Sequence, residues 1–342
     1  MDLDIYDLIS SASYSTSYTV TEGDEVVHKD LPFTCSEYQL IPINENLNKH
    51  SAWIPLGNYL SNLEKDLSDI SGSHFFTVRM DGKNFSKLYK DLQQMELFSQ
   101  GCAQEYDNIM IAVCRGMTNH LPTVTYAYTQ SDEITLVCSS TQLNSTSQNY
   151  EPHLFAGRHD KIISFTASLA TQFFCKELMQ LYLRKQVGRV MMEDLNFGKL
   201  PVVTFDSRIA KFDSLRNAFQ MVLWRSYDCS VNSVSTALRL LHCCKDNEIS
   251  KGELNGLSTL RKALLLHEES LLLSLSDHQK YGTLLYYGRD AAATAQAGSL
   301  HTATEAPNTS SKKSKRRKTS CQIIPGQPII NVKEGVISLG NV

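Results

Sequence analysis

The chain has 342 residues, of which 42% are hydrophobic, so it can bury a substantial core in one to three domains. Its formal charge of −3 becomes −9 without the six cations of the run 312–318, which excludes a uniformly basic nucleic-acid-binding surface. No apolar run approaches the roughly 20 residues of a membrane span, and the nine cysteines include no C-x-x-C pair, which favours reduced thiols in an intracellular protein.

Residues 1–54 are polar and weakly patterned, which predicts an N-terminal extension without chemistry of its own, with a short strand near Tyr38–Ile43. Apolar residues then recur at helical spacing in Pro55–Leu67. We expect this helix to open the main domain, residues 55–290.

A strand-forming run, Phe75–Met80, delivers Asp81 and Gly82 to its end. Gly82 allows a sharp turn, and the backbone N–H groups of the residues after it, Lys83–Phe85, can cradle phosphates. An ordinary β-turn is the alternative, because Asp-Gly is a common turn signal.

A second acidic turn lies in a predicted hairpin of Val124–Thr129 and Glu133–Cys138, whose turn carries Asp132 and Glu133. If the hairpin pairs with the first strand, Asp81 and Asp132 lie on neighbouring strands of one sheet. Oxygen ligands suit Mg²⁺, which takes one or two carboxylates together with substrate phosphates and water. A pair of such ions is the arrangement that supports nucleotidyl transfer.

Two helices are predicted around this hairpin. The first has Ser99 as its cap and apolar residues at three- and four-residue steps between positions 106 and 117. The second spans about Phe155–Leu183 and carries Arg158 and Lys161 in its opening turns. Cations at the start of a helix are unfavourable because of the helix dipole, so their presence suggests that they bind an anion such as a triphosphate. The alternative is that these residues belong to a solvent-exposed face of the helix without a function.

The strand Val202–Phe205 completes the order strand-helix-strand-strand-helix-strand. This is the βαββαβ order of ferredoxin-like folds, which polymerase palms and nucleotidyl cyclases also use. We therefore predict an α+β fold, with helices on an antiparallel sheet and additional helices beyond it. The later elements are a helix capped by Asp213, helices at Ser235–Cys243 and Leu254–Ser276, and a basic turn at Lys280 that enters a strand.

Residues 291–342 are predicted to form a mostly disordered, basic C-terminal tail. Its run of six cations fits a nuclear import signal, an electrostatic handle for RNA or a solubilising tail equally well. The β-type alternation of Ile323–Leu339 has no predicted place in the fold.

Four segments, in order, resemble signatures of the histidine tRNA guanylyltransferase family, whose members polymerise RNA in the 3′-to-5′ direction. Arg79–Phe85 resembles R-[ILM]-D-G-[RK]-x-F, and Gln130–Glu133 resembles Q-S-D-E. Trp224–Asn232 resembles W-R-x-x-D-C-x-x-N, and Lys280–Thr283 resembles K-x-G-T. The resemblance covers roughly residues 55–290.

The resemblance implies a polymerase-like palm and a role for each matching residue. Asp81, Asp132 and Glu133 would be catalytic, and Asp81, the Gly82 carbonyl and Asp132 would hold two Mg²⁺ ions. The residues expected to bind nucleotide are Gly82, Lys83, Asn84, Phe85, Ser131, Arg158, Lys161 and Asn232. Those expected to contact RNA are Lys262 and Lys280.

The implied activity is metal-dependent addition of nucleotides to the 5′ end of tRNA, with ATP and GTP as substrates. The implied assembly is a homotetramer without a membrane segment, in the cytoplasm or, through the basic tail, in the nucleus. Members that add one G to histidine tRNA usually read D-C-H-x-N, whereas Ser230 replaces the His here, which favours repair of truncated 5′ ends. A nucleotidyl cyclase-like palm enzyme and a non-catalytic RNA-binding protein are the alternatives.

Overall fold

The structure is a computed structural model that describes residues 17–22, 25–30, 53–121, 123–186, 198, 200–244, 256–270, 275–288 and 320–324. None of the helices in these ranges is both long and apolar enough to cross a membrane. The predicted strand at Tyr38–Ile43, the basic run 312–318 and most of the tail lie outside the described residues.

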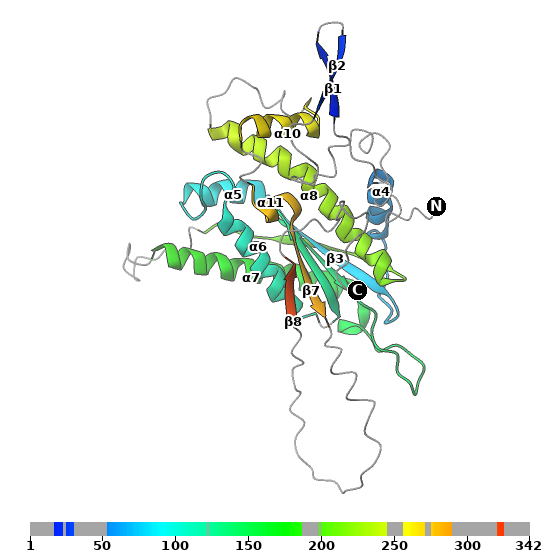
Figure 1. Cartoon of the computed structure of the whole chain (residues 1–342). Helices are drawn as coiled ribbons and strands as arrows, with labels where there is room; N and C mark the ends of the chain where they lie inside the picture. The colour runs from blue at the N-terminus through cyan, green and yellow to red at the C-terminus, as the bar shows by residue number, and fades with distance from the viewer. Residues whose placement is uncertain are drawn as a thin grey trace.

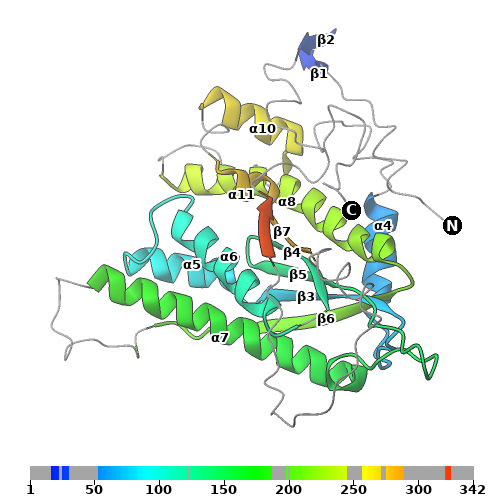
Figure 2. The ribbon, with the colours of Figure 1, turned by 60° about the horizontal axis from the view of Figure 1, so that its bottom comes forward.

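One six-stranded antiparallel sheet organises the main domain, with the strand order β6-β3-β5-β4-β7-β8 (Figures 1 and 2). The strands are β3 (Phe75–Gly82), β4 (Val124–Gln130), β5 (Glu133–Cys138), β6 (Phe205–Phe212), β7 (Thr283–Gly288) and β8 (Ser320–Ile324). The first strand of the palm, β3, lies between β5 and β6, and β4 lies on the other side of β5. This arrangement confirms the predicted ferredoxin-like palm. A separate hairpin, β1 (Ser17–Glu22) with β2 (Glu25–Asp30), forms within the N-terminal extension.

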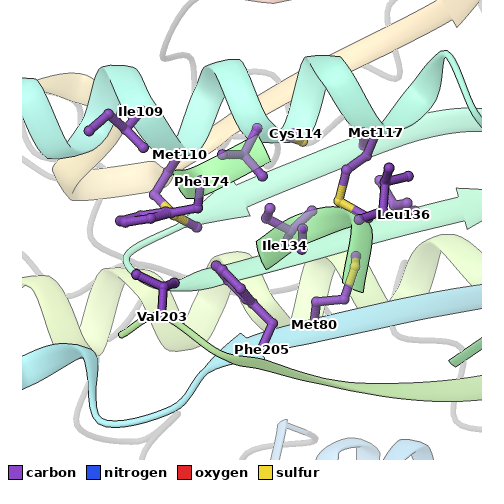
Figure 3. Packing of buried hydrophobic residues seen from close by; sticks show 14 of the residues in the cluster. Met80, Ile109, Met110, Cys114, Met117, Ile134, Leu136, Phe174, Val203 and Phe205 are labelled. Atoms are coloured by element: carbon purple, nitrogen blue, oxygen red, sulfur yellow. The ribbon is translucent and has the colours of Figure 1, made fainter. Parts of the chain in front are cut away.

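Helices cover both faces of the sheet. They are α4 (Trp53–Leu63), α5 (Phe85–Gln94), α6 (Gln104–Thr118), η2 (Leu154–Gly157), α7 (His159–Gln186), α8 (Leu215–Cys244), α10 (Thr259–Glu268) and α11 (Asp277–Tyr281). Helices α6 and α7 bury one face, where Met80, Met110, Ile134, Phe174 and Phe205 pack together (Figure 3). Helices α4 and α8 bury the other face.

Alternation along β3 assigns its side chains to the two faces. Phe76, Val78 and Met80 are buried in the core under α6 and α7. Arg79 and Asp81 therefore lie on the opposite face, toward α8. The alternation of the strand therefore places Asp81 on the sheet face toward α8 and keeps it out of the apolar core under α6 and α7.

Several helix boundaries differ from prediction. Helix α5 was not predicted; it begins directly after Asn84, whose left-handed φ of 60° lets the chain turn from β3 into a helix. Ser99 does not cap α6, because its hydroxyl donates to the carboxylate of Glu105 and the helix begins only at Gln104. Helix α7 begins later than predicted because Phe155 has a φ of 57°.

The predicted break in the helix after strand β6 was also wrong. Residues 215–244 form one helix, since no Gly or Pro interrupts them. Its first turn is capped by Ser214, whose hydroxyl accepts a hydrogen bond from the Asn217 backbone, and not by Asp213. Helix α8 therefore runs unbroken from the sheet to the packing site of α10.

Candidate functional site

The structure brings Asp81 and Asp132 together at one end of the sheet. The Gly82 backbone N–H donates to the Asp132 carbonyl at 3.0 Å, which fixes the end of β3 against the β4–β5 turn. Ser131 adopts a left-handed φ of 48°, which makes the two-residue turn between the strands possible. Both carboxylates are partly exposed to solvent.

The two carboxylates repel each other. Burial and the charge of Asp81 raise the pKa of Asp132 to about 6. Burial and the charge of Asp206 raise the pKa of Asp81. Neither side chain forms a salt bridge within the described part of the chain. Two crowded carboxylates without a cationic partner favour the binding of a cation.

Asp206 is a third carboxylate that we did not predict for the site. It lies on β6 directly opposite Asp81, and its side chain is 54% exposed. Arg208 approaches it at 3.4 Å. The sequence did contain a signal for Asp206. The βαββαβ order places the fourth strand beside the first, so an acidic residue at the fourth strand can lie beside Asp81.

Glu133 has different surroundings from Asp132, its neighbour in sequence. Its carboxylate accepts from Arg225 Nε at 2.5 Å and from Arg79 Nη1 at 3.4 Å. Arg79 also donates to Glu64 at 2.6 Å, and Arg225 donates to Asp228 at 2.9 Å. Burial opposes the charge of Arg79, but the hydrogen bonds of Glu64 and the charge of Glu133 raise the pKa of the guanidinium above its ordinary value.

Glu133 was expected to be catalytic beside the expected metal ligands Asp81 and Asp132, and the structure places it in this buried network. Within the described residues, no group of three or more His, Cys, Asp or Glu side chains could hold one metal ion. Asp81 and Asp132 carry the free carboxylates, whereas Glu133 joins the sheet to α8. Glu133 therefore lies beside the site as a group that positions the β4–β5 turn.

The turn after Asp81 has the features expected of a phosphate cradle. A Cβ on Gly82 would lie 2.5 Å from the Phe85 ring, so only glycine permits this close approach. Asn84 makes no side-chain cap to α5, so the first N–H groups of the helix are left for an anion. Lys83 and Asn84 are exposed, but the Lys83 N–H already donates to the Thr204 carbonyl at 2.9 Å.

Phe85 can contribute only its backbone to such a cradle. Its side chain is 3% exposed and makes edge contacts with Tyr106, Phe174 and Phe205. These contacts anchor the start of α5 to the core, so the cradle is held rigidly beside Asp81.

Arg158 and Lys161 are not brought to this end of the sheet, contrary to expectation. The Gly157 carbonyl accepts from Ile70, and Asp69 accepts from the His159 N–H at 3.1 Å, which ties the start of α7 to the segment before β3. That segment precedes Phe75 at the start of β3, whereas Asp81 is at the other end of the strand, six residues or about 20 Å further along at ~3.3 Å per residue. The carboxylate of Asp69 also already serves the helix N-terminus.

The remaining predicted residues lie on α8, α10 and α11. Asn232 is exposed and donates to Asp228 at 2.8 Å, so the buried network ends at this residue. Lys280 is on α11 with a side chain only 11% exposed. Lys262 donates to Ser235 at 3.1 Å where α10 packs on α8.

The third and fourth signature segments touch each other. The Cys229 thiol lies 3.8 Å from the Gln279 carbonyl and 3.7 Å from the Lys280 carbonyl. At the end of α11, Gly282 has a φ of 74° and packs against the Tyr128 ring. The conformation of this glycine lets the chain enter β7 beside β4.

Comparisons with known proteins identify relatives of one kind. The family model described as tRNAHis guanylyltransferase (Thg1) matches residues 57–213. A tRNA(His) guanylyltransferase of Neurospora crassa is 25% identical over 160 residues, which are 47% of this chain and 46% of that protein. One of Debaryomyces hansenii is 24% identical over 164 residues, which are 47% and 51%. The chain thus spans about half the length of the curated relatives it matches.

Two solved structures are also similar. A bacterial tRNA(His) guanylyltransferase (Thg1)-like protein in complex with ATP has a TM-score of 0.49 and 21% identity, covering 68% of this chain and 87% of its own. The tRNA(His) guanylyltransferase of Saccharomyces cerevisiae has a TM-score of 0.48 and 20% identity, covering 65% and 89%. Because both TM-scores are below 0.5, the fold assignment rests on the strand order above. Residues 57–213 of this chain are therefore similar to the tRNAHis guanylyltransferase family, by the matching family model and by the signature segments.

Proposed function

We propose that this protein is a metal-dependent nucleotidyltransferase that adds nucleotides to the 5′ end of tRNA. The observation that carries the proposal is the pairing of Asp81 with Asp132, two crowded, partly exposed carboxylates beside the uncapped start of α5. The family match of residues 57–213 supports the same reaction class.

The donor set fits Mg²⁺. Asp81, Asp132 and the Gly82 carbonyl would hold it. Burial and neighbouring carboxylates raise the pKa of Asp81 and Asp132, and a bound cation would offset both effects. When bound, Mg²⁺ would neutralise phosphate charge and polarise a phosphoryl oxygen. We expect two ions, by resemblance to the family.

The chain's own residues would bind and orient the triphosphate of ATP or GTP. The N–H groups at the start of α5 point toward an anion at this turn, and the exposed Lys83 adds a positive charge. Ser131 is exposed in the β4–β5 turn, directly before Asp132. The Glu133–Arg225 ion pair would hold the turn in place, and holding reactants in position supplies much of catalysis in such sites.

The proposed substrate is a tRNA with a truncated 5′ end. Ser230 stands where members that add a single G to histidine tRNA usually have His, and this replacement favours the repair activity. The proposed assembly is a homotetramer, to be measured by light scattering. The cytoplasm is the proposed location, with nuclear import through residues 312–318 as the alternative.

Incubation of the purified chain with Mg²⁺, ATP, GTP and 5′-truncated or full-length tRNA, followed by sequencing of the products, tests the proposal. We expect extension of the truncated tRNA, its loss in Asp81→Ala, and its retention in the control Asp213→Ala, an exposed residue away from the pair. A cyclic nucleotide formed without RNA would indicate a cyclase. Binding of tRNA without extension by the folded wild type would indicate a non-catalytic RNA-binding protein.

A further inference from the structure

Helix α5 presents a basic face directly after the phosphate cradle. Lys87 and Lys90 are three residues apart on α5, so they share one side of the helix, and both are exposed, as is Lys83 in the turn before the helix. The one acidic residue of α5 is Asp91, four residues after Lys87, and no salt bridge joins the two in the described ranges. Figures 1 and 2 show α5 at the periphery of the molecule, beside α6.

The opposite face of α5 fixes the direction of these lysines. Phe85, Leu88 and Leu92 are buried in the main core at the same helical spacing. The helix therefore cannot rotate, and the side chains of Lys87 and Lys90 must extend into solvent.

Some surface cations of the described chain are already paired with carboxylates. Lys185 pairs with Glu105 at 2.9 Å, and Lys211 pairs with Asp66 at 2.7 Å. In the described ranges, neither Lys87 nor Lys90 forms a salt bridge. Their charge is therefore available to a partner.

We propose that Lys87 and Lys90 bind backbone phosphates of the RNA substrate and lead its end to Asp81. This inference rests on the proposed function. Lys87 and Lys90 are separated by a helical rise of about 4.5 Å. Two lysines this close together can contact neighbouring backbone phosphates of one RNA strand.

The charge balance of the molecule supports an RNA contact confined to such a surface. The chain is −3 overall, and the run 312–318 supplies six of its cations. An acidic protein that binds RNA needs a local cluster of cations, and lysines contact phosphates as point charges without reading sequence.

The test is tRNA binding by fluorescence anisotropy across a series of salt concentrations, comparing wild type with Lys87→Gln/Lys90→Gln. Each phosphate contact contributes about 0.7 to 0.9 to the slope of log K against log salt. The double variant should therefore lower the slope by about 1.4 to 1.8 and weaken binding about 5- to 8-fold per lysine at 0.1 M salt. The control is Lys65→Gln/Lys176→Gln, two exposed lysines on α4's end and on α7.

Binding of ATP and GTP, measured by calorimetry, should be unchanged in the double variant, and circular dichroism should show an unchanged fold because both side chains are exposed. If the wild type extends tRNA and the double variant has the same salt slope as the wild type, this inference is overturned but the proposed function stands. Weaker nucleotide binding with unchanged tRNA binding would also overturn it, assigning the lysines to the triphosphate. A wild type that neither binds nor extends tRNA would overturn the proposed function itself.

Discussion

Neutralising Asp132 and neutralising Glu133 should have opposite effects on stability, although the two residues are adjacent in sequence. The pKa of Asp132 is raised to about 6 by burial and by Asp81, so its ionised form is unfavourable in the folded protein above pH 6. Glu133 instead compensates Arg79 and Arg225, whose side chains are 9% and 11% exposed.

The sizes of the two effects follow from these surroundings. A pKa raised from 3.8 to about 6 corresponds to about 3 kcal/mol at neutral pH, and the partial exposure of Asp132 reduces this to about 1–3 kcal/mol. Asp132→Asn should therefore raise the free energy of unfolding by that amount. Glu133→Gln leaves two buried guanidinium groups without their shared carboxylate, and removing one partner of a buried ion pair costs about 3–5 kcal/mol.

Urea unfolding at pH 7.5, in the presence of a metal chelator, measures both changes. Each should shift the urea concentration of half-unfolding while the dependence of the unfolding free energy on urea stays constant. Repeating the measurement in Mg²⁺ should stabilise the wild type but not Asp132→Asn, because the ion binds only the folded site. A Glu133→Gln variant as stable as the wild type would refute the assignment of Glu133 to the arginine network. A marked loss of stability in Asp132→Asn without Mg²⁺ would refute the account of the crowded carboxylates.

Three further outcomes are expected. Burial raises the pKa of Asp107 to about 7, so its ionisation lowers the free energy of unfolding as pH rises from about 4 to 7. Asp107→Asn should remove this dependence, which is worth about 2–3 kcal/mol between pH 5 and pH 8 when measured by urea unfolding. Gly282→Ala should cost at least about 1–3 kcal/mol in thermal unfolding, because alanine is strained at a φ of 74° and its Cβ would meet the Tyr128 hydroxyl. Gly82→Ala should reduce kcat/KM for nucleotide addition at least about tenfold while tRNA affinity is retained, because its Cβ would displace the Phe85 ring and with it the cradle; unchanged kinetics would refute that role.

Local spacing was sufficient to predict three strands of the palm and the turn that carries Asp132, but the fourth strand was predicted at Val202–Phe205 and lies at Phe205–Phe212. The alternation of β3, the two-residue turn at Ser131 and the glycine after Asp81 are properties of a few consecutive residues, so they can be read without knowing what lies across the sheet. The expected α+β class and the approach of Asp81 to Asp132 follow from them.

Contacts between distant segments could not be read in this way. The role of Glu133 depends on Arg225, 92 residues away, and the position of Asp206 beside Asp81 depends on strand register. Arg158 lies far from Asp81 because the start of α7 is tied to the segment before β3. The period of the sequence tells which residues share a face. The strand order and the packing of α8 determine which charges meet, and so they distinguish carboxylates without a salt bridge, such as Asp132, from Glu133, which is held between two arginines.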